Sequence, residues 1–167
     1  MKYKVNKKQN NSKMCFVCGL ANDYGLQASF YELDNGELVA IFKPLEEHQS
    51  YPGRLHGGVA SAILDETIGR AINLKEEGTW GVTVELSLRY KKPVPLDKEL
   101  KAVGRITRDS KWLFEGTGEI LLPNGEVAVT AKGKYMKLPI GKISSEFNLE
   151  DDWKLCPQEN DPKEVEY

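Results

Sequence analysis

The chain has 167 residues, of which 40% are hydrophobic, and its 23 Lys and Arg residues nearly balance 25 Asp and Glu residues, leaving a formal net charge of −2. This length fits one domain with a sizeable core. Because no run of Lys and Arg alternates with aromatic residues, we expect neither nucleic acid nor an anionic membrane surface as a partner.

The first residues suggest neither a targeting signal nor a folded element. No apolar stretch approaches the roughly 20 residues that cross a bilayer, and residues 1–8 lack the apolar segment of a signal peptide. We therefore expect a cytoplasmic protein. Residues 1–14 are polar and basic and have too little apolar surface to order themselves, which predicts an N-terminal tail or an arm on a neighbour.

The three cysteines cannot all pair, and in a reducing compartment we expect free thiols. Cys15 and Cys18 have the spacing of half a zinc site, but no second such pair follows, so the prediction is no metal. No Lys, Arg or His stands beside them in the sequence to favour a thiolate, so redox activity is not expected either.

Two strands and a loop come next. Apolar and polar residues alternate over residues 25–33, and Asp34-Asn35-Gly36 supplies a tight turn before the apolar run 38–42, which predicts an antiparallel hairpin. The loop 43–55 contains Pro44, Pro52 and Gly53 and brings three polar residues ahead of the following glycines: His48, Gln49 and Ser50. We expect His48 to be a solvated loop residue.

The segment from Val59 has a helical period with apolar residues on nearly all faces, which predicts a buried central helix. Gly57 and Gly58 precede it, so backbone N–H groups at the positive end of the helix are open to a ligand oxygen. The pair is typical of an oxyanion hole, and equally of a tight turn into a packed helix. His56 is expected to hold this turn by packing or by a backbone hydrogen bond.

Asp65 is the candidate acid of this helix. A carboxylate within such an apolar segment is costly unless it is used or paired. We interpret Asp65 as a catalytic base; the alternative is a buried acid paired with Arg70 or a hydroxyl. Glu66 is the competing base, but one position of rotation about the helix should point it elsewhere.

Four more strands are predicted over residues 79–90, 100–107, 112–121 and 127–138, with Pro123-Asn124-Gly125 as a second hairpin turn. Gly116 and Gly118 suggest strong bending or the close approach of a ligand. The order of two strands, one helix and four strands predicts an α+β hotdog fold, in which one long curved antiparallel sheet of about six strands wraps a central helix. The acidic residues 140–167 form either a disordered tail or a clasp over the surface, including the basic N-terminal arm.

Several motifs together resemble a known family. His56-Gly57-Gly58, then Leu64-Asp65-Glu66, then the strand 83–90 running into Lys92-Pro93-Val94, resemble the hotdog-fold acyl-CoA thioesterases of the PaaI-like group. The resemblance covers roughly Cys15 to Leu138, and we assign the domain to residues 15–139, between the tails 1–14 and 140–167.

The resemblance implies a hydrolase that cleaves an acyl-CoA thioester to free acid and CoA, with CoA as part of the substrate and no other cofactor. It also implies a homodimer, or a homotetramer formed as a dimer of dimers. Thr83 matches a family position whose hydroxyl holds the water or the carboxylate. Gln49 and Ser50 lie in the loop that often supplies an Asn or Gln toward the thioester.

The predicted roles follow from the residue types. The Gly57 N–H, supported by Gly58, would stabilise the oxyanion, and Asp65 would act as general base or, as the second choice, as direct nucleophile. We also predict that His56 and Glu66 are substrate-binding residues. Arg89 is the basic residue that we assign to the CoA phosphates.

Gly57 and Asp65 are eight positions apart on one helix, which is about 12 Å along its axis. Because a base and an oxyanion donor must each lie about 3 Å from the reacting group, the two residues must serve one substrate from different subunits. The sequence therefore predicts an obligate dimer with two shared sites.

Two other functions remain open. A non-catalytic acyl-CoA sensor would keep the fold and the glycines, but neither tail has the helix-turn-helix pattern of a DNA-binding regulator. A hotdog-fold hydratase would need an Asp and a His close together at the start of the helix, and the acids nearest to His56 on its N-terminal side are Glu46 and Glu47.

Overall fold

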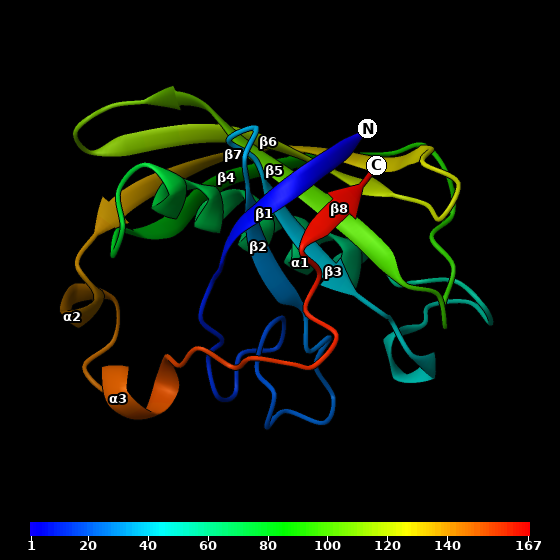
Figure 1. Cartoon of the computed structure of the whole chain (residues 1–167), viewed down its shortest axis with the longest axis horizontal. Helices are drawn as coiled ribbons and strands as arrows, with labels where there is room; N and C mark the ends of the chain where they lie inside the picture. The colour runs from blue at the N-terminus through cyan, green and yellow to red at the C-terminus, as the bar shows by residue number, and fades with distance from the viewer.

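The computed structural model describes all residues, 1–167. Eight antiparallel strands form one curved sheet in the order β4-β7-β6-β5-β3-β2-β1-β8, and the central helix α1 lies in its concave face (Figure 1). The strands are β1 Lys2–Lys8, β2 Ser29–Leu33, β3 Leu38–Phe42, β4 Trp80–Tyr90, β5 Leu100–Asp109, β6 Leu113–Leu121, β7 Val127–Leu138 and β8 Glu164–Glu166. The helices are η1 Glu46–His48, α1 Gly57–Arg70, η2 Ala71–Leu74, α2 Ile140–Ile143 and α3 Leu149–Asp152.

Helix α1 packs closely on the sheet because β6 has two glycines, without side chains, where the helix contacts it. A Cβ added to Gly116 would lie 2.6 Å from the side chain of Ile68, and one added to Gly118 would lie 2.9 Å from it. Ile68 and Ile63 are fully buried. These two glycines therefore allow close approach of the helix, where the sequence left open the approach of a ligand.

The predicted fold class, one antiparallel sheet around a central helix, is confirmed, but the sheet has eight strands where about six were predicted. The two extra strands, β1 and β8, come from the segments that the sequence assigned to tails. Residues 25–28 precede β2, so that the first strand of the predicted hairpin begins at Ser29. No helix of the chain is long and apolar enough to cross a membrane.

The expectation that residues 1–14 do not order is wrong for the strand β1. This strand pairs with β2 on one side and with β8 on the other, so backbone hydrogen bonds hold it in the sheet. Tyr3 and Val5 pack against a small second core that includes Tyr31 and Val165. Few apolar residues suffice here, because an existing sheet edge and the C-terminal strand supply the partners.

The acidic C-terminal segment takes the second of the two forms considered, a clasp over the N-terminal strand. Lys8 pairs with Asp161 at 2.6 Å, and the N-terminal amine donates to the carbonyl of Tyr167 at 2.6 Å. Figure 1 shows both ends of the chain side by side at β1 and β8. Earlier in the same segment, Trp153 packs edge-to-face against Trp80, with ring centroids 4.8 Å apart.

Candidate active site

Asp65 lies on α1 facing β4 and β7, and hydroxyl groups from these two strands hold it. Thr83 Oγ1 donates to the two carboxylate oxygens at 2.9 and 3.1 Å, and the Tyr135 hydroxyl donates to Oδ1 at 3.0 Å. Burial raises the pKa of Asp65, while these hydrogen bonds oppose the shift. Arg70 instead pairs with Glu66 at 2.7 Å. The alternative in which Asp65 pairs with Arg70 is therefore wrong, while the alternative of pairing with a neighbouring hydroxyl is what the structure shows. The carboxylate has no cationic partner, and Asp65 stays a candidate general base.

Tyr135 is a residue that sequence reasoning missed. It is 1% exposed, stacks on Phe114 with centroids 4.9 Å apart, and also donates to the Asp65 carbonyl at 3.1 Å. Burial and the nearby Asp65 charge raise the pKa of Tyr135, so its hydroxyl stays a proton donor. In the sequence Tyr135 is one of several apolar residues on the inner face of β7, and nothing local indicates its polar partner.

Asp65 lines a small hollow at the surface of the protein. This hollow, about 150 Å³, is lined by Asp65, Thr83 and Tyr135 together with the aromatic residues Trp80 and Trp153. It adjoins a larger hollow of about 530 Å³, with which it shares Trp80, Trp153 and Asn73. The Asp65 hollow and a wider, partly apolar hollow are therefore separated only by the residues that line both.

At the start of α1, the N–H groups of Gly57 and Gly58 have different hydrogen bonding. His56 is the N-cap, and its Nδ1 accepts a hydrogen bond from the Gly58 N–H at 2.8 Å. The Gly57 N–H makes no hydrogen bond within the chain, and the Gly57 carbonyl accepts one from the Tyr90 hydroxyl at 2.8 Å. The prediction that His56 holds the turn is confirmed. The Gly58 N–H donates to His56, so the supporting role predicted for Gly58 does not include a free N–H group.

The loop before α1 carries two of the predicted substrate-binding residues on its surface. Gln49 and Ser50 are exposed and lie close to the helix start, since Gln49 pairs with Leu55 in an isolated bridge. The expectation of a solvated His48 is wrong. His48 is 3% exposed, its Nδ1 accepts from the Leu45 N–H at 2.9 Å, and its Nε2 contacts the Tyr24 carbonyl at 2.8 Å.

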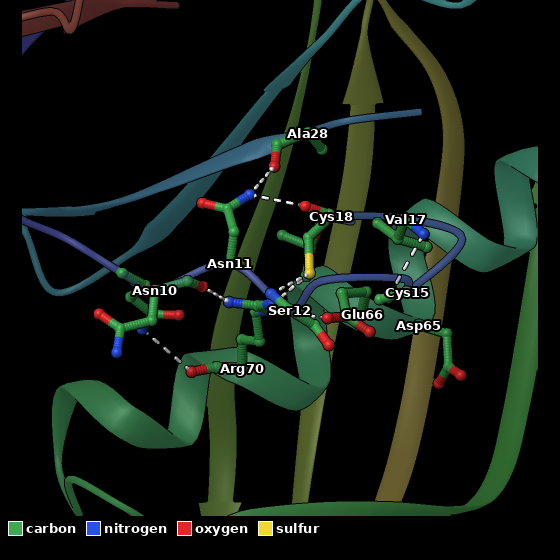
Figure 2. Close-up of polar contacts among 12 residues, drawn as sticks. Asn10, Asn11, Ser12, Cys15, Val17, Cys18, Ala28, Asp65, Glu66 and Arg70 are labelled. Carbon is green, nitrogen blue, oxygen red and sulfur yellow. Dashed lines mark hydrogen bonds and ion pairs between the residues drawn. The ribbon is translucent and has the colours of Figure 1, made fainter. Parts of the chain in front are cut away.

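Two predicted substrate-binding residues lie away from Asp65. Glu66 points from the other side of α1 toward Arg70 and Cys18, while Asp65 points away from that cluster (Figure 2). Glu66 is therefore the partner of a buried guanidinium. Arg89 is exposed and lines a hollow of about 540 Å³ that also includes Arg105 and Lys91.

The hollow at Gly57 differs from the hollow at Asp65. It measures about 330 Å³, is lined by Gly57, Tyr90, Lys91 and Lys92, among others, and shares no residue with the Asp65 hollow. It adjoins the Arg89 hollow through Lys91. The structure therefore places the two candidate catalytic groups of one chain in separate spaces.

Removing the Tyr135 hydroxyl should change the pH dependence of activity if Asp65 is the base. Tyr135→Phe removes a hydrogen bond that lowers the pKa of Asp65, so this pKa rises further. Because the base must be ionised, activity is lost as pH falls through this pKa, and the acid limb of kcat/KM should move to higher pH. An acid limb at the wild-type position would contradict this positioning role of Tyr135.

Comparisons with known proteins agree with the fold. Residues 52–129 match the family described as Thioesterase superfamily. This matched range includes the start of α1, Asp65 and Thr83. Human acyl-coenzyme A thioesterase 13 is 28% identical over 78 residues, which are 47% of this chain and 56% of that protein. The chain thus matches little more than half the length of this curated relative.

Two solved structures share the fold of this chain. A thioesterase superfamily protein superposes with a TM-score of 0.68 at 27% identity, over 74% of this chain and 60% of that one. The E. coli PaaI protein from the phenylacetic acid degradation operon superposes with a TM-score of 0.61 at 18% identity, over 68% of this chain and 80% of that one, which shows a shared fold. Residues 52–129 of this chain are therefore similar in sequence to the thioesterase superfamily, and the hotdog domain around them has the fold of a solved thioesterase superfamily protein.

Proposed function

We propose that this protein hydrolyses an acyl-CoA thioester to a free acid and CoA. The observation that carries the proposal is the Asp65 carboxylate, held by the Thr83 and Tyr135 hydroxyls in an open hollow, together with the unbonded Gly57 N–H at the helix start. The human relative is named an acyl-coenzyme A thioesterase and is similar over about half of the chain, which supports the substrate class.

In the proposed reaction, Asp65 takes a proton from a water molecule as the water oxygen attacks the thioester carbonyl carbon. The Gly57 N–H donates to the carbonyl oxygen, which becomes negative in the tetrahedral intermediate. The C–S bond then breaks, and the CoA thiolate leaves and takes up a proton. Thr83 holds the carboxylate, or the water, in position. Direct attack by Asp65 through an acyl-enzyme anhydride is the second choice.

One substrate must meet both groups, and this requires two subunits. Gly57 is the first residue of α1 and Asp65 is the ninth, so about 12 Å of helix separates them. Their hollows share no lining residue. We infer that Gly57 of one chain serves Asp65 of the other in a homodimer.

The arrangement of β4 along α1 supports such a dimer. β4 is an edge strand of the sheet, with Val84 55% and Tyr90 56% exposed. It contacts α1 at Asp65 through Thr83, and at Gly57 through Tyr90. A two-fold axis across the middle of this face would bring the Gly57 end of one chain to the Asp65 end of its partner.

The hollows suggest where each part of the substrate lies. Lys91 and Lys92 line the Gly57 hollow, and Arg89 lies in the adjoining one, so this side is suited to the CoA phosphates. The acyl group would then extend from Asp65 between Trp80 and Trp153 into the larger hollow. These aromatic rings favour an apolar acyl group.

Thr83→Val should reduce activity less than loss of the base. The substitution keeps the β-branched shape but removes the hydroxyl that positions the carboxylate, so we expect kcat to fall by about 10-fold with little change in stability. Steady-state kinetics and thermal unfolding measure both quantities. A loss larger than that of Asp65→Asn would show that the roles of the two residues are wrongly assigned.

Turnover of an acyl-CoA panel, followed by a thiol-reactive dye, tests the proposed function. Release of free CoA thiol that depends on the enzyme supports it. Saturable acyl-CoA binding without thiol release would favour the sensor. Hydration of an enoyl-CoA without thiol release would favour the hydratase.

A further inference from the structure

A tight turn brings Cys15 and Cys18 together beside α1. The Gly19 N–H donates to the Cys15 carbonyl at 2.7 Å, and a Cβ on Gly19 would lie 2.5 Å from the same oxygen. Cys15 is half-buried, whereas Cys18 is fully buried. The two sulfur atoms lie within 4.8 Å of each other and of a Glu66 carboxylate oxygen. Neither thiol takes part in the proposed hydrolysis.

Arg70 supplies the cation that the sequence around the cysteines lacks. Its Nη2 donates to Cys18 Sγ at 2.8 Å, its Nε to Glu66 at 2.7 Å and its Nη1 to the Asn10 carbonyl at 2.7 Å (Figure 2). The guanidinium also lies over the rings of Phe30 and Trp153 at 4.3 and 4.6 Å. Arg70 is therefore fixed in place with one N–H group aimed at a sulfur atom.

These contacts favour a single negative charge on the thiol pair. A hydrogen bond with Cys18 lowers the pKa of Cys15 to about 7 against partial burial and the Glu66 carboxylate, and the same bond raises the pKa of Cys18. Arg70 opposes the rise at Cys18. These contacts therefore favour the thiolate form of Cys15 over that of an ordinary free thiol.

A divalent metal fits this cluster less well. Cys15, Cys18 and Glu66 are three ligands, and no fourth His, Cys, Asp or Glu joins them. Arg70 already donates to two of the three, and its positive charge opposes that of a metal ion. The same guanidinium favours the thiolate that disulfide chemistry needs.

We propose that Cys15 and Cys18 form a reversible disulfide when the protein meets a peroxide, with Cys15 as the attacking thiolate and Cys18 as the resolving thiol. Cys15 is the more accessible sulfur, and the Cys18 sulfur has the guanidinium that stabilises its thiolate.

The two steps balance. The Cys15 thiolate attacks one peroxide oxygen, the O–O bond breaks, and a sulfenic acid and hydroxide form. The Cys18 thiolate then attacks the Cys15 sulfur, the S–S bond forms, and a second hydroxide leaves. With the two thiol protons the products are one disulfide and two water molecules.

Hydrogen peroxide treatment of the reduced full-length protein tests this inference. Remaining thiols are blocked with iodoacetamide, and trypsin, which does not cleave between Lys43 and Pro44, releases the fragment Met14–Arg54, which contains Cys15 and Cys18 but no other cysteine. We expect this fragment to lose two hydrogen atoms and to take up no iodoacetamide. Dithiothreitol should reverse the change. Cys156, in a separate fragment, is the internal control and should remain alkylated.

Single variants then assign the roles. In Cys18→Ser, peroxide should leave a Cys15 sulfenic acid that dimedone traps, whereas Cys15→Ser should show no dimedone adduct and no disulfide. Circular dichroism shows whether each variant is folded. Oxidation of Cys156 before the pair, or a disulfide between two chains, would overturn the inference. So would protein purified with one zinc ion per chain that resists peroxide until the zinc is chelated.

Discussion

Replacing Asp65 with asparagine should lower kcat/KM for thioester hydrolysis by at least about 100-fold, which is about 2.7 kcal/mol of transition-state stabilisation. Asparagine has nearly the same volume and can still accept a hydrogen bond from Thr83, so fold and dimer should persist. It cannot take a proton from water. Steady-state kinetics measure the loss, with circular dichroism and size-exclusion chromatography to verify folding and assembly.

Glu66→Gln is the matched control, since it removes the neighbouring carboxylate. Glu66 is the ion-pair partner of Arg70, which is 6% exposed, so this variant should lose stability because a buried charge loses its partner. Its kcat should stay within a few-fold of wild type below its melting temperature. Near-wild-type kcat in Asp65→Asn, with a large loss in Glu66→Gln, would move the base to Glu66.

Gly57→Pro should lower kcat by about 100-fold to 1,000-fold, the cost of losing one oxyanion donor. Proline removes the Gly57 N–H group. The helix does not need this group, because Gly57 is the first helical residue and its N–H makes no hydrogen bond in the chain. His56 has φ −64° and ψ 135°, the conformation that a following proline requires.

Gly57→Ala is the control for the added bulk. A Cβ at this position meets only the Tyr90 ring, at an ordinary contact distance of 3.5 Å, and alanine keeps the N–H group. We expect Gly57→Ala to retain most of the wild-type kcat. If alanine and proline reduce kcat equally, the effect is steric and the oxyanion role of Gly57 is wrong.

The fold could be predicted from the sequence because its core elements carry strong local patterns. The alternation over residues 79–90 predicts β4 to within one residue, and the last predicted strand, 127–138, coincides with β7. The strand β1 could not be predicted, because its stability comes from pairing with β2 and with β8 at the far end of the chain.

The candidate site could be predicted from the sequence where its residues lie on one helix. The positions of Gly57 and Asp65 on α1, and the contact with Thr83, follow from the pattern and the family resemblance. Tyr135 and Arg70 did not follow, because each acts across a long sequence separation, on Asp65 and on Cys18. Such contacts depend on the tertiary fold, which brings the two residues of each pair together, and they have no pattern in the local sequence.

Mixed dimers test most directly whether the site is shared between subunits. Asp65→Asn and Gly57→Pro chains, each verified as folded, dimeric and inactive alone, are combined and the heterodimers are isolated with two affinity tags. In a shared site, one half-site of each heterodimer pairs an intact Gly57 with an intact Asp65, while the other has neither. A heterodimer should then regain about half the wild-type activity, and an unsorted equal mixture about a quarter. Background activity in verified heterodimers would contradict the shared site.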